Sequence, residues 1–192
     1  MNTNKILMGL MLPAIIGASA VFAQQPTMNK LRFQRISRTG NYIAQAANRQ
    51  IGGDVVIPDT YNGTPVTDVA DFGGSAITSV TFPDSVTTIR MSAFDGCTGI
   101  RSITFPASVT KIDYHAFKGC TNLTSVTFKR GDATLASGRS PSFPGDLYTK
   151  YTAGGAGTYT RSPGGTVWTK QGGRPDPVEY CPTCGQPLPK KR

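Results

Sequence analysis

Several residue types on which enzymes depend are scarce in this sequence of 192 residues. It contains one histidine, His115, one tryptophan and four cysteines. The eleven acidic residues are scattered, and no pair has the spacing that would bring two carboxylates together for acid–base chemistry. No glycine-rich loop leads from a strand into a helix, as a phosphate-binding loop would. We therefore expect a protein that is not an enzyme.

Long hydrophobic runs are also rare, and the one present lies near the start. Lys5 precedes an apolar run from Ile6 to Ala18, and residues 21–23 (Val-Phe-Ala) fit the pattern that signal peptidase recognises. The run is short for a membrane span and contains proline and glycine. We interpret residues 1–23 as a secretory signal peptide. The mature chain, from Gln24, is expected without a membrane span and exported to the cell surface, the periplasm or the medium.

Acidic residues are outnumbered by basic ones, 11 to 20, which gives a formal charge of +9 at pH 7. A nucleic-acid-binding protein would need basic groups interleaved with aromatic platforms, or a known recognition motif, and the sequence has neither. A solvated basic surface is the simplest interpretation, and attraction to acidic glycans or anionic cell surfaces is the functional one. We expect no nucleic-acid partner.

The middle of the chain is a tandem repeat. Ser-Val-Thr-Phe-Pro at 79–83, Ser-Ile-Thr-Phe-Pro at 102–106 and Ser-Val-Thr-Phe-Lys at 125–129 follow one another at a step of 23, since 102 − 79 = 23 and 125 − 102 = 23. Between them, Ala-Phe-Asp-Gly-Cys at 93–97 corresponds to Ala-Phe-Lys-Gly-Cys at 116–120. This period and apolar spacing are typical of a leucine-rich-repeat solenoid, in which each coil buries its apolar face against the next.

We therefore predict a β-rich solenoid, a short leucine-rich-repeat stack of about three coils of period 23 with a small β cap at each end. A degenerate first coil lies in residues 66–77. The expected divisions are a signal peptide (1–23), an N-terminal leader and β cap (24–56), the solenoid (57–130), a loop and C-terminal cap (131–171), and a Gly/Pro-rich spacer with a basic tail (172–192).

The caps are predicted from local patterns. Alternation at 31–36, 42–44 and 54–57 indicates three strands that form a small sheet over the open end of the first coil. At the other end we expect an exposed loop after Phe128, then a short helix within 143–151 and a hairpin that contains Trp168 as a core residue.

The repeat also resembles a known family. Leu-Thr-Ser-Val-Thr-Phe at 123–128, with Val-x-x-Ile at 109–112 and Ala-Phe-x-Gly-Cys at 116–120, is similar to the BspA-like leucine-rich repeats of bacterial surface proteins. The resemblance extends roughly from Leu31 to Gln171. It implies adhesion, with host matrix proteins, other cell-surface proteins or glycans as partners.

One face of the predicted strands points outward and carries mostly hydroxyl groups. The residues expected there are Thr78, Ser79, Thr81, Arg101, Ser102, Thr104, Thr124, Ser125 and Thr127. Such columns either bind a partner or merely favour strand formation and keep an exposed sheet soluble. Our interpretation is an exported, non-catalytic binding or adhesion module that uses this face. A structural envelope component without a specific ligand is an alternative.

The four cysteines form two pairs. Cys97 and Cys120 occupy the same position in successive coils, about 4.8 Å apart by strand spacing, and we interpret them as buried ladder thiols, with a disulfide as the alternative. Cys181 and Cys184 resemble one knuckle of a zinc ribbon, but a structural zinc site needs four ligands. We expect no cofactor, and zinc only if two chains share it. An inert disulfide or free thiols are the simpler interpretations, and a zinc-binding or redox-active tail on a structural solenoid is the competing function.

Two remaining features have plain explanations. His115 aligns with Ser92 on the variable convex side of the repeat, and we expect it to be exposed. Arg130-Gly131-Asp132 is a triplet that integrin-type receptors can engage, but three residues occur often by chance, and we interpret it as a turn.

Overall fold

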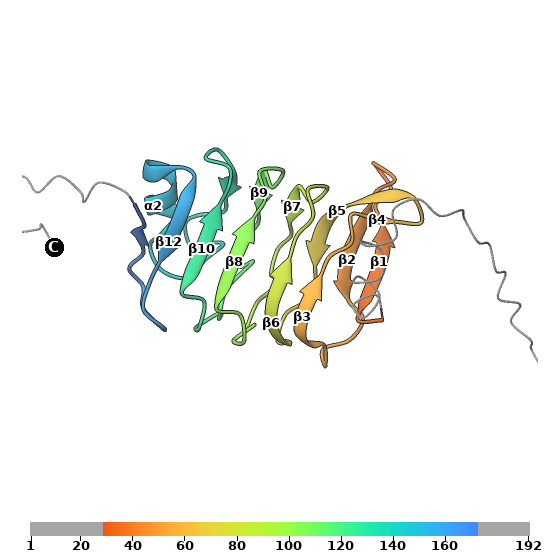
Figure 1. Cartoon of the computed structure of the whole chain (residues 1–192), viewed down its shortest axis with the longest axis horizontal. Helices are drawn as coiled ribbons and strands as arrows, with labels where there is room; N and C mark the ends of the chain where they lie inside the picture. Colours follow the sequence, from red (N-terminus) through yellow and green to blue (C-terminus); the bar gives the residue numbers. More distant parts are fainter. Residues whose placement is uncertain (1–28, 173–192) are drawn as a thin grey trace, which may run out of the picture.

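The computed structural model describes residues 29–172, which form a solenoid (Figure 1). The expected signal peptide (1–23) and the tail with Cys181 and Cys184 lie outside the described residues. The described part has four coils, whose first strands are β3 (Gly52–Val56), β6 (Ala76–Thr81), β8 (Ser102–Phe105) and β10 (Ser125–Phe128). No helix among residues 29–172 has the length and apolar character needed to cross a bilayer.

Two sheets run along the stack. We call one the front sheet: β3 pairs with β6, β8 pairs with β10, and β12 (Gly157–Thr160) and β13 (Thr169–Lys170) continue it beyond β10. The two hydrogen-bonded groups meet where β6 of the first lies beside β8 of the second (Figure 1). The other is the back sheet, in the order β1 (Leu31–Arg35), β2 (Tyr42–Ala46), β5 (Thr64–Ala70), β7 (Thr88–Ile89), β9 (Lys111–Ile112) and β11 (Thr134–Leu135), with β4 (Thr60–Tyr61) beside β5.

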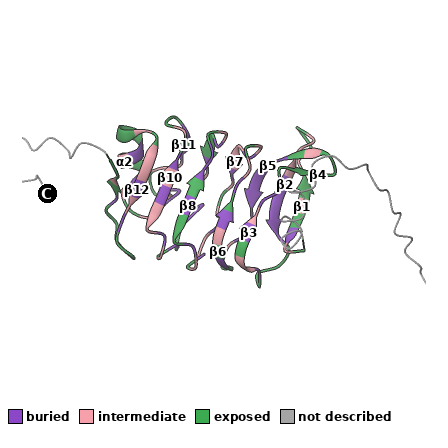
Figure 2. Cartoon of the chain, in the orientation of Figure 1, coloured by how far each residue is buried: buried purple, intermediate pink, exposed green. Residues whose placement is uncertain are grey.

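Paired residues in both sheets are 23 residues apart in the sequence wherever the clean repeats stack. Val126 lies opposite Ile103 in the front sheet, and Ile112 lies between Ile89 and Leu135 in the back sheet. Identical coil positions therefore stack on one another, and the apolar side chains of alternate residues meet between the sheets. Figure 2 shows buried residues along the strands of both sheets.

Stacked phenylalanines form two rows in the core. In the first row, Phe72, Phe94, Phe117 and Phe143 follow one another at ring-centroid distances of 5.2, 5.2 and 4.8 Å. In the second, Phe82, Phe105 and Phe128 are 5.6 and 5.4 Å apart. Each ring covers the face of the ring in the coil before it, which is why one coil alone could not bury these residues.

The structure corrects two of the expected boundaries. The strand expected near 54–57 does not belong to a cap: as β3 it pairs in parallel with β6 and forms the front strand of the first coil, whose later part was predicted in residues 66–77. The stretch after Phe128 is not only an exposed loop, because Thr134–Leu135 forms β11 and pairs with Lys111–Ile112 of β9. The period therefore continues into the fourth coil, where Ala133 and Leu135 are buried.

Each end of the stack is closed by antiparallel structure. At the N-terminal end, β1 pairs with β2, and β2 lies parallel to β5. At the C-terminal end, α2 (Leu147–Gly154) precedes the β12–β13 hairpin, and β12 pairs antiparallel with β10. Tyr151, Tyr159 and Trp168 are buried there, as expected for Trp168.

A buried arginine completes the C-terminal cap. The Arg161 guanidinium donates to the backbone oxygens of Leu123 (2.7 Å), Cys120 (2.9 Å) and Gly165 (2.5 Å). It also lies 4.9 Å from the ring centroid of Trp168. Arg161 thus supplies donors to last-coil carbonyls where the stack ends.

Candidate partner-binding surface

Outward side chains of the front sheet form columns that cross the strands. In one column Ser102, Ser125 and Thr160 lie opposite one another, and in the next Thr104, Thr127 and Thr158 do so. Ser79 and Thr81 hold the corresponding positions in β6, where they pair with Asp54 and Val56 of β3. The parallel register brings the residues of β6, β8 and β10 together, because every coil repeats the same outward positions, and antiparallel β12 extends both columns.

All nine residues predicted for this face lie in or directly beside β6, β8 and β10. Thr78, Thr81, Arg101, Ser102 and Thr104 are exposed, and Ser79, Thr124, Ser125 and Thr127 are half-buried. Within residues 29–172, the hydroxyls of Thr81, Ser102, Thr104 and Ser125 have no hydrogen-bond partner. They are available to a ligand.

Two groups on this face were missed in the sequence. Asp54 accepts hydrogen bonds from Ser79 (2.7 Å) and Thr78 (3.1 Å), and these bonds lower the pKa of its carboxyl group below the ordinary 3.8. Thr158 of the cap shares a 2.8 Å hydrogen bond with Thr127. A signal for Asp54 was present, since Asp-Val-Val-Ile-Pro at 54–58 parallels Ser-Val-Thr-Phe-Pro at 79–83.

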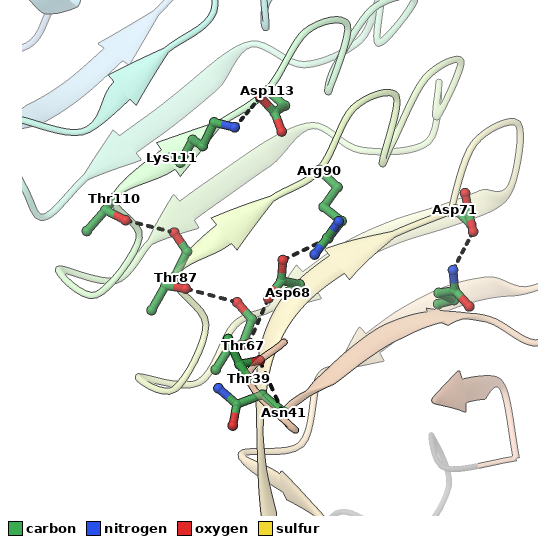
Figure 3. Close-up of polar contacts among 11 residues, drawn as sticks. Thr39, Asn41, Thr67, Asp68, Asp71, Thr87, Arg90, Thr110, Lys111 and Asp113 are labelled. Carbon is green, nitrogen blue, oxygen red and sulfur yellow. Dashed lines mark hydrogen bonds and ion pairs between the residues drawn. The ribbon is translucent and has the colours of Figure 1, made fainter. Parts of the chain in front are cut away.

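In the second and third coils, charged side chains of the back sheet are paired with each other (Figure 3). Arg90 donates to Asp68 at 2.7 Å, and Lys111 lies 2.9 Å from Asp113. Thr87 and Thr110 donate their hydroxyls to carbonyl groups of the preceding coil. These contacts link neighbouring coils and leave fewer free groups for a ligand.

Cys97 and Cys120 lie in the core as free thiols. Each donates across the stack, Cys97 to the Phe72 oxygen and Cys120 to the Phe94 oxygen, both at 3.1 Å. Burial raises the pKa of both thiols, that of Cys120 to about 12. Neutral, buried thiols of this kind are poor nucleophiles and poor metal ligands.

The histidine and the Arg-Gly-Asp triplet lie in turns outside the front sheet. His115 is half-buried with a left-handed φ of 58°. Arg130 is paired with Asp132 within its own turn, and its carbonyl accepts a 2.8 Å bond from Tyr151. No group of three or more metal-ligating side chains occurs among residues 29–172.

Cys181 and Cys184 are outside the described residues, so the zinc, disulfide and redox interpretations of this pair stay predictions. A zinc titration of the full chain against a Cys181→Ser variant tests the first of them.

An open depression lies apart from the front sheet. It is formed by the β2–β3 turn and by turns of the first two coils, and charges of both signs line it: Arg32, Arg49, Asp71 and Asp95. Asp71 is engaged by the Gln45 amide at 2.5 Å.

The repeat itself matches a family model described as a BspA type leucine rich repeat region (6 copies), over residues 68–139. Residues 68–139 form a BspA-type leucine-rich-repeat region. The match begins in β5 and extends beyond β11, so it includes the fourth coil of the solenoid.

Solved structures of bacterial leucine-rich-repeat proteins are similar to this chain. A leucine rich repeat protein of T. pallidum is 29% identical, with 55% of this chain and 50% of that chain covered and a TM-score of 0.49. One from Bacteroides ovatus is 24% identical, with 51% and 28% covered and a TM-score of 0.45. A leucine rich cell surface protein from Faecalibacterium prausnitzii is 18% identical, with 58% and 42% covered and a TM-score of 0.30. The chain spans half or less of the length of each. No curated protein matches the sequence.

Proposed function

We propose that this chain is an exported, non-catalytic binding module that attaches to a partner on a cell or matrix surface through its front sheet. The observation that carries the proposal is the set of outward hydroxyls on β6, β8 and β10 that have no partner within residues 29–172. Leucine-rich repeats commonly present such a repeated strand face to other molecules. The match to BspA-type repeats supports the same class of function.

The proposed surface is small, because four coils contribute to it in the described part of the chain. Stable protein interfaces bury about 800 Å² on each partner. We therefore expect weak binding by a single chain and strong attachment only where several chains act together, since linked sites raise the effective concentration.

The proposal is tested by binding of the full chain to an array of matrix proteins and glycans. The test variant carries Arg101→Glu and Thr104→Glu on the front sheet. A matched control carries Thr134→Glu and Arg139→Glu, which make the same change of charge on β11 and in the turn after it. Circular dichroism establishes that both variants are folded.

We expect the front-sheet variant to lose a bound partner at low and at moderate salt, while the control retains it. Equal binding by both variants would contradict a front-sheet site and would direct attention to the depression between the turns or to the cysteine tail.

A further inference from the structure

Charge is unevenly distributed along the front sheet. In the first coil Asp54 is already engaged by Ser79 and Thr78. In the later coils Arg101 precedes β8 and Lys129 follows β10, and both are exposed. Strands β8, β10 and β12 contain no acidic residue. The C-terminal half of the sheet therefore presents positive charge and hydroxyls without a carboxylate on its strands.

Both cations are on the side of the sheet that carries the hydroxyl columns. Arg101 holds the coil position of Thr78, whose hydroxyl reaches the same Asp54 oxygen as that of Ser79. Lys129 follows Thr127 by two residues, and its backbone N–H donates to the Phe105 oxygen at 3.2 Å, which continues the ladder. Residues two apart on a strand share a face.

These cations are also unpaired, unlike Arg90 and Lys111 on the back of the stack. Within residues 29–172 neither Arg101 nor Lys129 forms an ion pair or a side-chain hydrogen bond, whereas Arg90 and Lys111 each contact an aspartate (Figure 3). An unpaired guanidinium or ammonium group on an exposed face attracts anions, and its field is focused where no carboxylate opposes it.

We propose that the part of the front sheet made by β8, β10 and β12 binds an acidic polysaccharide, one that carries carboxylate or sulfate groups. This inference rests on the proposed function and names its partner class. Arg101 and Lys129 bind the anionic groups, and the hydroxyl columns, which repeat at the strand spacing of about 4.8 Å, donate to and accept from the sugar hydroxyls.

A protein partner fits this area less well. Protein interfaces take most of their binding energy from aromatic or arginine anchors in desolvated pockets. The exposed large apolar residues of the described chain are Met91, Tyr114, Tyr148 and Val167, and none of them lies in β8, β10 or β12. A flat, hydroxylated and cationic surface suits a hydrated, anionic chain.

The experiment measures binding of the full chain to dextran sulfate, hyaluronan, uncharged dextran and polyaspartate. Dextran sulfate and dextran share a backbone, so their comparison isolates the charge. Hyaluronan separates carboxylate from sulfate recognition, and polyaspartate supplies negative charge without sugar hydroxyls. A variant with Lys190, Lys191 and Arg192 changed to Gln removes the contribution of the basic tail.

Three variants then locate the site. Arg101→Gln with Lys129→Gln removes the two cations, and Thr104→Val with Thr127→Val removes hydroxyls while keeping the side-chain shape. Lys118→Gln with Arg139→Gln is the control, since it removes two exposed charges from the turns that lead away from β9 and β11.

We expect the cation variant to weaken binding of the acidic polysaccharide about tenfold or more and the hydroxyl variant about threefold. The control should change it less than twofold, and the tail variant should retain the front-sheet effect. Equal loss in the control, equal binding of polyaspartate, or binding that vanishes with the tail would overturn the inference.

If no acidic polysaccharide binds but a matrix protein is retained and lost in the Arg101→Glu, Thr104→Glu variant, this inference is wrong and the proposed function stands. If neither class binds, both are wrong.

Discussion

At the scale of single residues, the described chain is stabilised by polar side chains that donate hydrogen bonds to backbone carbonyl groups left without a partner by the repeat. Arg161 is the clearest case, because one buried guanidinium serves three carbonyl groups and packs on Trp168. Burial lowers the pKa of this guanidinium from its ordinary value, yet it stays charged at any physiological pH. A buried carbonyl that loses its donor costs about 1–3 kcal/mol.

We therefore expect Arg161→Met to lower the free energy of unfolding by about 3 kcal/mol. Methionine keeps the apolar stem but supplies no donor. Chemical denaturation measures the change, and Arg139→Met, an exposed position, should alter it by about 0.5 kcal/mol or less. A similar, small effect at both positions would show that water replaces the guanidinium.

The buried thiols give a second prediction, on pH. Burial, with a smaller effect of the nearby Cys97 thiol, raises the pKa of Cys120 from 9.0 to about 12. Below pH 9 the thiol is protonated in both the folded and the unfolded chain, so this stabilisation is fully present. As pH rises from about 9 towards 12, the unfolded chain loses its proton first, and stability falls by about 1.4 kcal/mol per pH unit for this group.

Cys120→Ser removes this ionisation and keeps a donor, and a buried serine is already present in the first coil, where the Ser75 hydroxyl donates to the Phe72 oxygen at 2.5 Å. Denaturation between pH 8 and 10.5 should show a shallower decline for Cys120→Ser than for the unchanged chain. An identical decline would mean that other groups, such as the tyrosines, dominate.

At the scale of the element, each coil depends on its neighbours more than on its own sequence preferences. Phe117 stacks on Phe94 at 5.2 Å and on Phe143 at 4.8 Å, and its ring edge meets Phe105. The front strands of the coils, β3, β6, β8 and β10, have four to six residues, and back strands β7, β9 and β11 have two each, too few to be stable alone.

Phe117→Ala should therefore destabilise the chain by about 3–5 kcal/mol, the range for a buried aromatic that leaves a cavity. Tyr114→Ala, three residues earlier and 50% exposed, should cost far less. Thermal unfolding of both variants checks the difference. A mild effect of Phe117→Ala would indicate that the row closes over the gap.

At the scale of the whole molecule, the two caps decide whether the stack remains single. Antiparallel β12 covers the edge of β10, which would otherwise offer unpaired backbone groups to another chain. It also supplies Tyr159 and, through the hairpin, Trp168 to the core.

A chain that ends at residue 155 should consequently self-associate, whereas one that ends at residue 172 should keep the size of the full chain. Light scattering at equal concentrations distinguishes them. If the shorter chain has the same size as the longer one, β12 is not needed to protect the edge.

The features of the fold that could be predicted were those encoded by residues close together in the sequence. The 23-residue period predicted the coils and the outward hydroxyl columns, because period and alternation are properties of neighbouring residues. β3 was predicted as a strand but assigned to the cap, because Asp54 precedes Ser79 by 25 residues rather than 23, with a register shift between Gly53 and Asp54. β11 was missed because its two residues lie in a polar stretch, although Leu135 follows Ile112 by 23.

The sequence by itself thus determined the repeat, its inward and outward positions and the presence of caps. The tertiary structure alone decided which groups are engaged and which are free. Arg161 meets a carbonyl 41 residues earlier, and Asp54 meets a hydroxyl 25 residues later. Such contacts depend on how coils stack and where the stack ends, which no local pattern specifies, and they separate the occupied groups of the front sheet from those left for a partner.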